Sequence, residues 1–523
     1  MEERILTVEQ MVFCERYSDS HGVSLGRLMD NAGRELGRHI FSVCSTRGVR
    51  EPLILAGKGN NGGDGFVAAA HLFEKGLRPT VMLCCGAPAT DLAVRAFEAM
   101  PKAIPVIGYD GTGLCGAKIG AARVLVDCIF GTGFRGSLPM ELVPLFEDIS
   151  GNPHFTVACD LPSGVDARSG QCCKGAVRAD LTVTMHAPKL GMMLSPAKYL
   201  VGRLEVCDIG IPESSELSGS PEMQEKIYAA GDMEYYARLL PKRPPDGHKG
   251  TFGKLICLCG SEHYIGAAGL SVTAALRTGA GLVELFTPRR TASALAAGLY
   301  ECIYTAAPSD EDGFVTSEVL PELLDALKKA DALLIGCGLG CTKETSRLVA
   351  ALIERSPVPV ILDADGINSI AANIDILLKK SSEVVLTPHP GELARLCGAS
   401  LEEVARDRHG YAAALARKYG VTVISKSAET LVCHGSRTQL ITAGNTALSK
   451  GGSGDILAGI TASLIAQSPR DLTYAVQLSP YILGKTAELL SEDRSQRGLL
   501  PRDILDGIPV FLKKLETASE GGR

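Results

Sequence analysis

Residues 448–459 read LSKGGSGDILAG, and an apolar run continues from Ile456 to Ile465. Three glycines in four positions, Gly451, Gly452 and Gly454, predict an irregular turn. The apolar run predicts a buried helix that begins near Gly454 or Asp455. A glycine-rich turn that leads into a helix leaves backbone N–H groups unpaired at the positive end of the helix dipole. The stretch therefore predicts a site for an anion such as phosphate.

Asp455 would lie in the first turn of this helix. Taken alone, an aspartate there is about as often a helix cap as a functional group. A carboxylate at the edge of an anion site can also accept a proton from a substrate. The combination favours a catalytic role over a capping role.

This combination resembles the glycine-rich anion hole and catalytic aspartate of ribokinase-like small-molecule kinases. The wider run Asn445–Gly459 is similar to one branch of that superfamily, the ADP- or ATP-dependent NAD(P)H-hydrate dehydratases. The resemblance implies a ribokinase-like fold for the second half of the chain.

Composition restricts the class of protein. The 523 residues suffice for two to four domains, and 46% hydrophobic with 21% charged residues is ordinary for globular proteins. The net charge of -6, without a dense basic run, argues against nucleic-acid binding. The 17 scattered cysteines indicate free thiols in a reducing compartment. We find no signal core and no run of about 18 apolar residues, so we expect a cytoplasmic protein that binds no membrane.

The first half contains a second glycine-rich run. The apolar segment Pro52–Ala56 predicts a strand, residues 57–65 read GKGNNGGDG, and Phe66–Lys75 predicts a helix. Strand, glycine-rich loop and helix in this order form the phosphate-binding arrangement of doubly wound sheets. The run matches neither a P-loop nor the usual dinucleotide fingerprint, and its oxygens could also hold a hard cation.

Three further segments repeat the order of strand and polar loop. We expect strands at 122–127, 155–160 and 181–185, each ending at or followed by a polar or ionisable residue. Open α/β sheets bind ligands at the carboxyl ends of their strands. One such aspartate could be a cap, but several aligned strand ends favour a site. We therefore expect Asp127, Asp160 and Ser163 to converge with Asn61 on one crevice.

These four motifs together resemble the NAD(P)H-hydrate epimerase domain over residues 1–212. The resemblance implies that the hydrated nucleotide is bound by Asn60, Asn61, Gly62, Gly63, Asp64, Gly131, Thr132, Gly133, Phe134, Arg135 and Asp160. It implies that Asn61, Asp127 and Ser163 bind a potassium ion. Asp160 would be the acid or base at the epimerised carbon. Lys189 is a weaker candidate that could equally be a solvated loop lysine.

The polar Ser- and Pro-rich run within residues 213–224 predicts a linker. Beyond it, strands expected near 255–258, 281–286, 332–335, 359–362, 384–387 and 421–425 alternate with helical segments. We therefore expect an α/β protein with two doubly wound domains: a Rossmann-like epimerase domain at 1–212 and a ribokinase-like domain at 225–523.

The resemblance to the dehydratases also implies residue roles in the second half. The resemblance implies that Ala267, Gly338, His389 and Asp455 bind the hydrated nucleotide, with Asp455 as the catalytic base. Its residues for the adenine nucleotide would be Lys426, Ser427, Ala428, Glu429, Thr430 and Gly454. Three positions depart from the family's usual pattern: Cys337, Ser427 and Lys450. A lone histidine is usually structural, but the prolines on either side of His389 favour a positioned ligand contact.

The leading hypothesis is a two-domain enzyme that repairs hydrated NADH and NADPH, called NADHX and NADPHX. The first domain would interconvert the R and S hydrates, with K⁺ bound. The second would dehydrate the S form with ADP or ATP and Mg²⁺ through a phosphorylated intermediate. We also expect a homo-oligomer.

Two alternatives stay open. The second domain could be a vitamin or sugar kinase of the same fold, against which the run 387–392 (TPHPGE) and the attached first domain argue. The first domain could be a non-catalytic binding module, against which Asp160 and the run Asn60–Asp64 argue.

Overall fold

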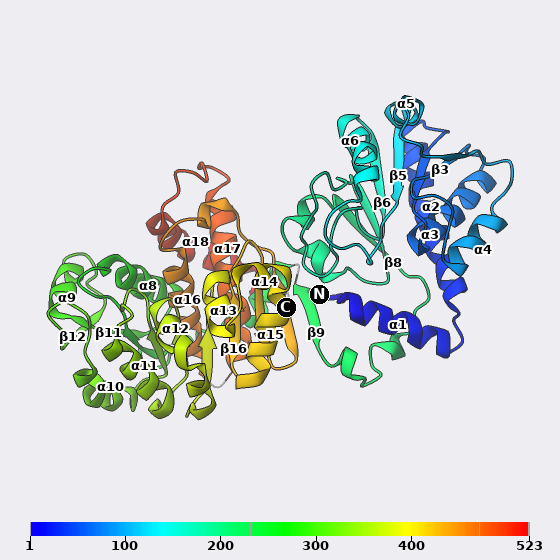
Figure 1. Ribbon diagram of the computed structural model, residues 1–523. Coiled ribbons are helices and arrows are strands. Elements are labelled where there is room, and N and C mark those ends of the chain that lie inside the picture. Colours follow the sequence, from blue (N-terminus) through cyan, green and yellow to red (C-terminus); the bar gives the residue numbers. More distant parts are fainter. Residues whose placement is uncertain (1, 231, 470, 521–523) are drawn as a thin grey trace. The chain divides into compact units, whose positions relative to one another are not determined.

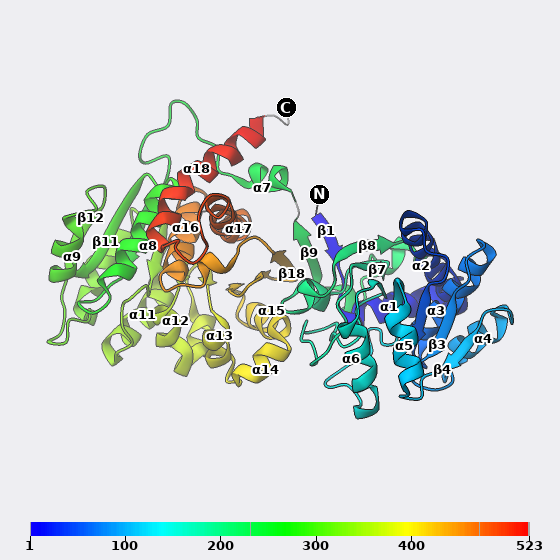
Figure 2. The same ribbon diagram turned by 90° about the horizontal axis from the view of Figure 1, so that it is seen from above.

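The computed structural model describes residues 2–230, 232–469 and 471–520. The chain forms two compact units, drawn in Figures 1 and 2. The N-terminal unit is Arg4–Lys226, and the C-terminal unit contains Glu2, Glu3 and the residues from Ile227 onward. Each unit has helices around a mainly parallel sheet, which confirms the expected α/β class. Among the described residues, no helix is long and apolar enough to cross a membrane.

The N-terminal unit is built on a seven-stranded sheet with the order β4-β3-β2-β5-β6-β7-β8. All its neighbouring strands pair in parallel. The chain runs outward from β2 to one edge and then from β5 to the other, so the strand order reverses between β2 and β5. Open α/β sheets bind ligands beside such a reversal. The strands are β2 (Leu53–Ala56), β3 (Thr80–Leu83), β4 (Val106–Gly108), β5 (Val124–Cys128), β6 (Phe155–Cys159), β7 (Leu181–Met185) and β8 (Arg203–Cys207).

Both faces of this sheet are covered, because side chains alternate along each strand. Ile54 and Ala56 of β2 belong to the core formed with α2 and α3, whereas Leu53 and Leu55 belong to the core formed with α5 and α6. Burial on both faces explains why β2 is an uninterrupted apolar run. The helices are α1 (Val8–Ser20), α2 (Leu25–Arg47), α3 (Asn60–Glu74), α4 (Asp91–Ala99), α5 (Gly113–Ala121) and α6 (Val143–Gly151). Short 3₁₀ turns are η1 (Met140–Leu142), η2 (Leu190–Met193) and η3 (Ala197–Tyr199).

Helix α3 begins at Asn60, six residues before the predicted start at Phe66. The glycines of the run allow close packing rather than an irregular loop. A Cβ on Gly62 would lie 2.0 Å from the carbonyl oxygen of Gly57, and one on Gly63 would lie 2.7 Å from Met29. The first turn of α3 thus sits directly against the end of β2.

The segment expected to be a linker contains two 3₁₀ turns, η4 (Glu213–Ser215) and η5 (Pro221–Met223). It lies within the N-terminal unit. Ser215 and Met223 are buried, and the amide of Gln10 donates to the backbone oxygens of Glu222 and Glu225 at 3.1 and 2.7 Å. The composition predicted a linker, and in the structure two buried side chains and a buried glutamine hold this segment to α1.

The C-terminal unit is built on an eleven-stranded sheet with the order β1-β9-β18-β17-β16-β15-β14-β13-β10-β11-β12. The strands from β16 to β12 are parallel, and the β17–β18 hairpin is antiparallel. Here the strand order reverses between β10 and β13. The strands are β1 (Glu2–Ile5), β9 (Lys226–Ala230), β10 (Lys254–Leu258), β11 (Leu282–Pro288), β12 (Ile303–Ala307), β13 (Ala332–Ile335), β14 (Val360–Leu362), β15 (Val384–Leu386), β16 (Thr422–Ser425), β17 (Thr430–His434) and β18 (Arg437–Ile441).

The predicted apolar helix is α16 (Ser453–Gln467), and it is buried along almost its whole length. It packs beside α8 (Ile265–Thr278), as both views show (Figures 1 and 2). A Cβ on Gly459 would lie 2.1 Å from the carbonyl oxygen of Ser271, so only glycine permits this close contact. Gly452, which precedes the helix, has a φ of 101°. The helix therefore begins one to two residues earlier than predicted, and Gly454 is part of its first turn.

The remaining helices surround the same sheet. They are α7 (Met233–Leu239), α9 (Arg289–Ala296), α10 (Leu320–Leu327), α11 (Lys343–Arg355), α12 (Asp365–Ile370), α13 (Pro390–Cys397), α14 (Leu401–Arg406), α15 (Arg408–Tyr419), α17 (Leu472–Leu490) and α18 (Pro501–Glu520), with 3₁₀ turns η6 (Ser317–Val319), η7 (Ala371–Lys379) and η8 (Thr446–Leu448).

Candidate active sites

Asp455 is the third residue of α16, at the positive end of the helix dipole. The residue before the helix, Gly452, has no side chain to cap the free N–H groups. Lys426 adds a positive charge here, because its Nζ would lie only 3.3 Å from a Cβ on Gly454. The amides expected from the sequence and an ammonium group not predicted at this place thus converge at the start of α16, which suits an anion.

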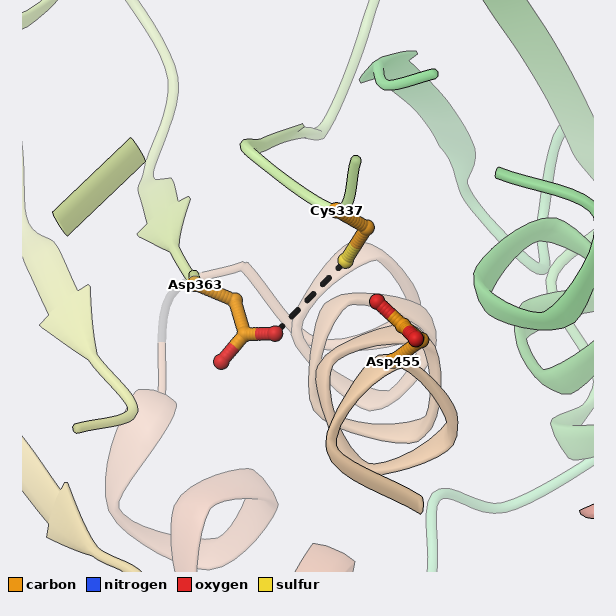
Figure 3. Close-up of side chains that lie close together, drawn as sticks. All are labelled: Cys337, Asp363 and Asp455. Carbon is orange, nitrogen blue, oxygen red and sulfur yellow. Dashed lines mark hydrogen bonds between the residues drawn. The ribbon is translucent and has the colours of Figure 1, made fainter. Parts of the chain in front are cut away.

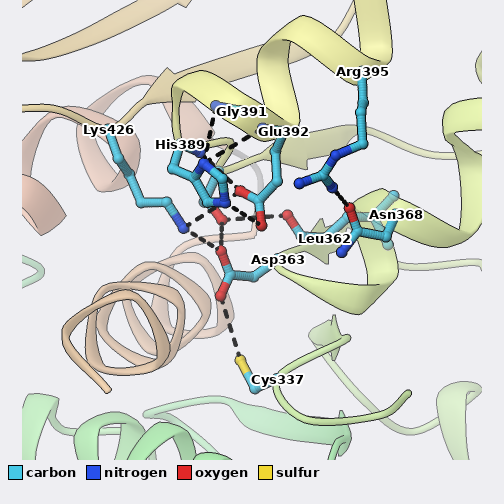
Figure 4. Close-up of polar contacts among 10 residues, drawn as sticks. Cys337, Leu362, Asp363, Asn368, His389, Gly391, Glu392, Arg395 and Lys426 are labelled. Atoms are coloured by element: carbon cyan, nitrogen blue, oxygen red, sulfur yellow. Dashed lines mark hydrogen bonds and ion pairs between the residues drawn. The ribbon is translucent and has the colours of Figure 1, made fainter. Parts of the chain in front are cut away.

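Asp363 directly follows β14 and links the polar side chains of this site (Figure 4). Its Oδ1 accepts hydrogen bonds from Thr387 Oγ1 at 2.5 Å and from Lys426 Nζ at 2.7 Å. Its Oδ2 lies 3.7 Å from the Sγ atom of Cys337. Lys426 is also 4.0 Å from a carboxylate oxygen of Glu392. The network fixes the position of the Lys426 ammonium beside the start of α16.

The carboxyl of Asp455 has a pKa raised to about 7. Burial is the largest cause and the negative charge of Asp363 is the next, while Cys337 and Lys426 act in the opposite direction. Figure 3 shows Asp455 and Asp363 on either side of Cys337. A group with a pKa near the working pH is well suited to accept a proton as a general base.

In the N-terminal unit, Asp160 follows β6 and carries a buried ion pair. Its Oδ1 lies 2.5 Å from Nζ of Lys189, whose side chain is 0% exposed. Lys189 Nζ also donates to Thr184 Oγ1 and to the carbonyl oxygen of Met185, each at 2.9 Å. Lys189 is therefore not the solvated loop lysine that was the alternative interpretation.

The backbone at Asp160 is strained, with a φ of 64° in a residue that is not glycine. Further carboxyls surround this ion pair. Burial, followed by the charges of Asp160 and Glu15, raises the pKa of Asp64 well above its usual value. Burial and the charge of Asp160 also raise the pKa of Glu15. Strain and like charges held together are typical of functional sites.

Asp127 lies inside β5 and is fully buried. Its carboxylate accepts hydrogen bonds from Ser163 Oγ at 2.5 Å, Ser163 N at 2.7 Å and Ile129 N at 3.2 Å. Burial raises the pKa of Asp127 to about 6, although these hydrogen bonds lower it. Asn61 lies nearby on α3: its Oδ1 is 3.4 Å from the place of a Cβ on Gly131. The Nδ2 of Asn61 is buried without a hydrogen-bond partner.

Comparisons with known proteins match both units. The family model described as NAD(P)H-hydrate dehydratase matches residues 255–510, and the one described as YjeF-related protein N-terminus matches residues 25–191. The bifunctional NAD(P)H-hydrate repair enzyme Nnr of Moorella thermoacetica is 35% identical over 94% of this chain and 93% of its own length. The chain belongs to the bifunctional NAD(P)H-hydrate repair enzymes.

The Escherichia coli repair enzyme Nnr is 32% identical over 93% of this chain and 89% of its own length. A solved Bacillus subtilis structure, described as an ADP/ATP-dependent NAD(P)H-hydrate dehydratase co-crystallized with ATP and Mg²⁺, is 29% identical, with a TM-score of 0.47 over 55% of this chain and 98% of that chain.

In this repair enzyme, the other residues of the C-terminal unit that the sequence singled out lie in separate places. Ala267 and Gly338 are neighbours, because a Cβ on Gly338 would lie 2.9 Å from Cβ of Ala267. Ser427 and Ala428 are exposed in the segment before β17, which begins at Thr430. The backbone oxygen of Glu429 accepts a hydrogen bond from Arg408 at 2.8 Å. Lys450 donates to the carbonyl oxygens of Arg497 and Leu499, so its ammonium holds a neighbouring loop.

His389 has the structural role that is usual for a lone histidine. It precedes α13, and its Nδ1 accepts from the backbone N–H groups of Gly391 and Glu392 at 3.0 and 3.4 Å (Figure 4). About half of the His389 side chain is exposed, and its Nε2 lies 3.4 Å from Glu392. The contact to a ligand stays a prediction.

The predicted substrate loops of the repair enzyme lie at the strand reversal between β2 and β5. Asn60 and Asn61 begin α3, whose preceding residue, Gly59, provides no side-chain cap. Residues 131–135 follow β5, where Arg135 donates to the backbone oxygens of Thr132 and Phe134 at 3.0 and 2.6 Å. Free amides at the start of α3 are suited to bind an anion.

Several polar residues at these sites were not predicted as site residues. Asp363 could have been found, because it stands at the end of an apolar strand in the same way as Asp127 and Asp160. Glu15 on α1 has no signal in the sequence, since only the folded chain brings α1 to Asp160. His186 and Glu216, which lie 3.2 Å apart, are likewise distant in sequence.

Proposed function

We propose that this chain repairs hydrated NADH and NADPH through two activities. The N-terminal unit epimerises the R and S hydrates. The C-terminal unit dehydrates the S hydrate with ADP or ATP as the phosphoryl donor. Membership of the family supports both activities, and the observation that carries the proposal is the Asp455 carboxyl at the start of α16, with a pKa near 7 beside Lys426.

The residues of the C-terminal unit suit phosphoryl transfer to the hydroxyl of the hydrated ring. Asp455 takes the proton of that hydroxyl while its oxygen attacks the terminal phosphorus. The amides at the start of α16 and the Lys426 ammonium stabilise the charge on the transferred group. Loss of inorganic phosphate from the ring carbon, with a proton from the neighbouring carbon, restores the ring double bond.

Mg²⁺ is the metal that escorts the nucleotide in this proposal. It binds phosphate oxygens and retained waters more than protein cages. In the described part of the chain, one group of three side chains could hold an ion, and it includes the soft sulfur of Cys337. This group suits Mg²⁺ poorly, so we assign Mg²⁺ to the nucleotide phosphates.

In the N-terminal unit, Asp160 exchanges a proton with the substrate at the epimerised carbon, and Lys189 holds its carboxylate in place. Asn61, Asp127 and Ser163 would bind K⁺. The set suits the ion in kind, because it offers one amide oxygen, one carboxylate and one hydroxyl. Asn61 lies beside Gly131, and the residue before Gly131, Phe130, donates to Ser163 Oγ at 2.9 Å. The Nδ2 of Asn61 has no hydrogen-bond partner, so a half-turn of the amide can direct its oxygen to an ion. The ion would order the loops around the nucleotide.

We also propose that the enzyme is cytoplasmic. All 17 cysteines are free thiols, which supports a reducing compartment. The homo-oligomeric state stays a prediction, which light scattering would test.

The test uses purified full-length protein and hydrated NADH with ADP or ATP, and it follows the return of dihydronicotinamide absorbance. Asp455→Asn keeps the shape of the side chain and should lower the dehydration rate about 10²–10⁴-fold, since it removes a general base. Its thermal unfolding temperature should be equal to or above that of the unchanged protein, because burial of the Asp455 carboxylate raises its pKa and so destabilises the fold when the group is ionised. A variant that keeps more than about half of the rate would refute the assignment of the base.

A further inference from the structure

A second role of the C-terminal site arises from Cys337. This residue lies in the loop after β13, where the strand order reverses, and it is fully buried. Its Sγ is 3.7 Å from Oδ2 of Asp363. One ligand atom from each of Cys337, Asp363 and Asp455 lies within 4.8 Å of the other two (Figure 3). Within residues 2–230, 232–469 and 471–520, this is the one such group of three.

The spacing of these atoms is close to that of a tetrahedral metal site. Ligands about 2.0–2.3 Å from a zinc ion are roughly 3.3–3.8 Å apart. The Cys337–Asp363 distance already falls in this range, and the Asp455 carboxylate needs to move by an ångström or so. Asp455 is only partly buried, so its side of the group remains open to a fourth ligand such as water.

Neighbouring groups prepare Asp363 for this role. Thr387 donates to its Oδ1. Lys426 also donates to Oδ1, and Oδ2 is directed at Cys337 (Figure 4). Hydrogen bonds of this kind orient a ligating carboxylate. The set of one sulfur and two carboxylates suits a borderline-soft cation such as Zn²⁺, which takes thiolate ligands, and it disfavours Mg²⁺.

We propose that Cys337, Asp363 and Asp455 form a site for Zn²⁺ that inhibits dehydration. Zn²⁺ binds to the thiolate, and the thiol proton passes to solvent as the metal–sulfur bond forms. The ion binds the Asp455 carboxylate, which would otherwise accept the substrate proton. Its positive charge also repels the ammonium of Lys426. This inference rests on the proposed function only in its effect on the rate, because metal binding can be measured without substrate.

The binding test uses full-length protein treated with a chelator and then titrated with Co²⁺ as a spectroscopic probe for Zn²⁺. A thiolate-to-cobalt charge-transfer band should appear and should be displaced by Zn²⁺. Cys337→Ala and Cys337→Ser should lose the band. Cys257 in β10 is another fully buried thiol of the same unit, and Cys257→Ala should keep the band. A band that persists in both Cys337 variants would overturn the site.

The activity test adds Zn²⁺ to the dehydration assay with Mg²⁺ in excess. Zn²⁺ should inhibit the unchanged protein and Cys257→Ala. Cys337→Ala should need about 10–100-fold more Zn²⁺ for the same inhibition, because even the loss of a residue that only supports a ligand lowers metal affinity by this factor. Equal inhibition of all three proteins would overturn the inhibitory role. If the protein binds Zn²⁺ through Cys337 but never dehydrates the hydrate, the proposed function fails and the metal site stands.

Discussion

The ammonium of Lys189 lies 2.5 Å from the carboxylate of Asp160, and their side chains are 0% and 14% exposed. A charged pair in such a place is stable only with further hydrogen bonds, which Thr184 and Met185 supply. The pair holds the Asp160 carboxylate in one orientation at the end of β6. The positive φ of Asp160 shows that the backbone at this residue is constrained as well.

Two substitutions at Asp160 distinguish the catalytic effect of its carboxylate from the effect of its backbone strain on stability. Asp160→Ala and Asp160→Gly should both abolish epimerisation, measured by NMR exchange between the two hydrates. The glycine variant should be more stable than the alanine variant by about 1 kcal/mol, because a positive φ costs an L-residue roughly 1–2 kcal/mol. Either variant with normal epimerisation would contradict the role of Asp160, and equal stabilities in urea would contradict the strain.

The pH dependence of dehydration should follow the pKa of Asp455. The base acts when deprotonated, so kcat/KM should be low below pH 7, rise through about pH 7 and reach a plateau above it. The charge of Asp363 contributes to the raised pKa, so Asp363→Asn should move the midpoint to lower pH, whatever its effect on the plateau. A midpoint that stays fixed in this variant would show that another group controls the profile.

Sequence patterns predicted the architecture because both sheets carry their signals locally. Apolar runs such as Leu53–Ala56 and Ala332–Ile335 form buried parallel strands, and polar residues follow at their ends. The start of α3 at Asn60 was missed, because glycines usually indicate irregular structure. Gly62 and Gly63 instead serve close packing against Gly57 and Met29, which only the assembled fold reveals.

The residues of the two sites also differ in whether a local sequence pattern or long-range packing places them. Asp455 and Asp160 stand in local motifs, so the sequence could place them at the start of a helix and the end of a strand, while their catalytic roles stay predictions. Glu15 and Glu216 could not, because helix α1 and the segment after β8 reach the site only through long-range packing. Composition predicted a linker at 213–224, but it gave no signal that Met223 is buried.

A monovalent cation should be required for epimerisation. Asp127→Ala should weaken K⁺ binding and nucleotide binding together, whereas Asp160→Ala should retain both. The measurement compares epimer exchange in potassium chloride with exchange in tetramethylammonium chloride, which is too large for the group of Asn61, Asp127 and Ser163. Equal rates in the two salts would eliminate the ion from the proposal.

The two activities should separate at residue 226. We expect a protein of residues 1–226 to be more stable than one that ends at Ser214, because the shorter chain lacks Glu216 and the buried Met223. A protein that begins at Ile227 should dehydrate but should melt below the full chain, since Glu2 accepts a hydrogen bond from Tyr235 at 2.7 Å and pairs with Arg437. If neither piece is soluble, the two cores are not independent.

The ion pair of His186 and Glu216 should make stability depend on pH. Burial alone would lower the pKa of His186, but hydrogen bonds with Cys14 and Glu216 and the charge of Glu216 raise it to about 9. A histidine whose pKa is about 6.5 when unfolded then stabilises the fold fully below about pH 6.5 and loses this contribution as pH rises through 9. Glu216→Gln should therefore destabilise the protein most at low pH.

The measurement is the free energy of unfolding of Glu216→Gln and of the unchanged protein between about pH 5.5 and pH 9.5. The difference should shrink as pH rises, but a part should persist, because Glu216 also pairs with Arg4 at 3.1 Å. Glu213→Gln, an exposed position on the same segment, is the control and should show no trend with pH. A constant difference for Glu216→Gln would mean that His186 stays neutral in the folded protein and that Glu216 acts through Arg4 alone.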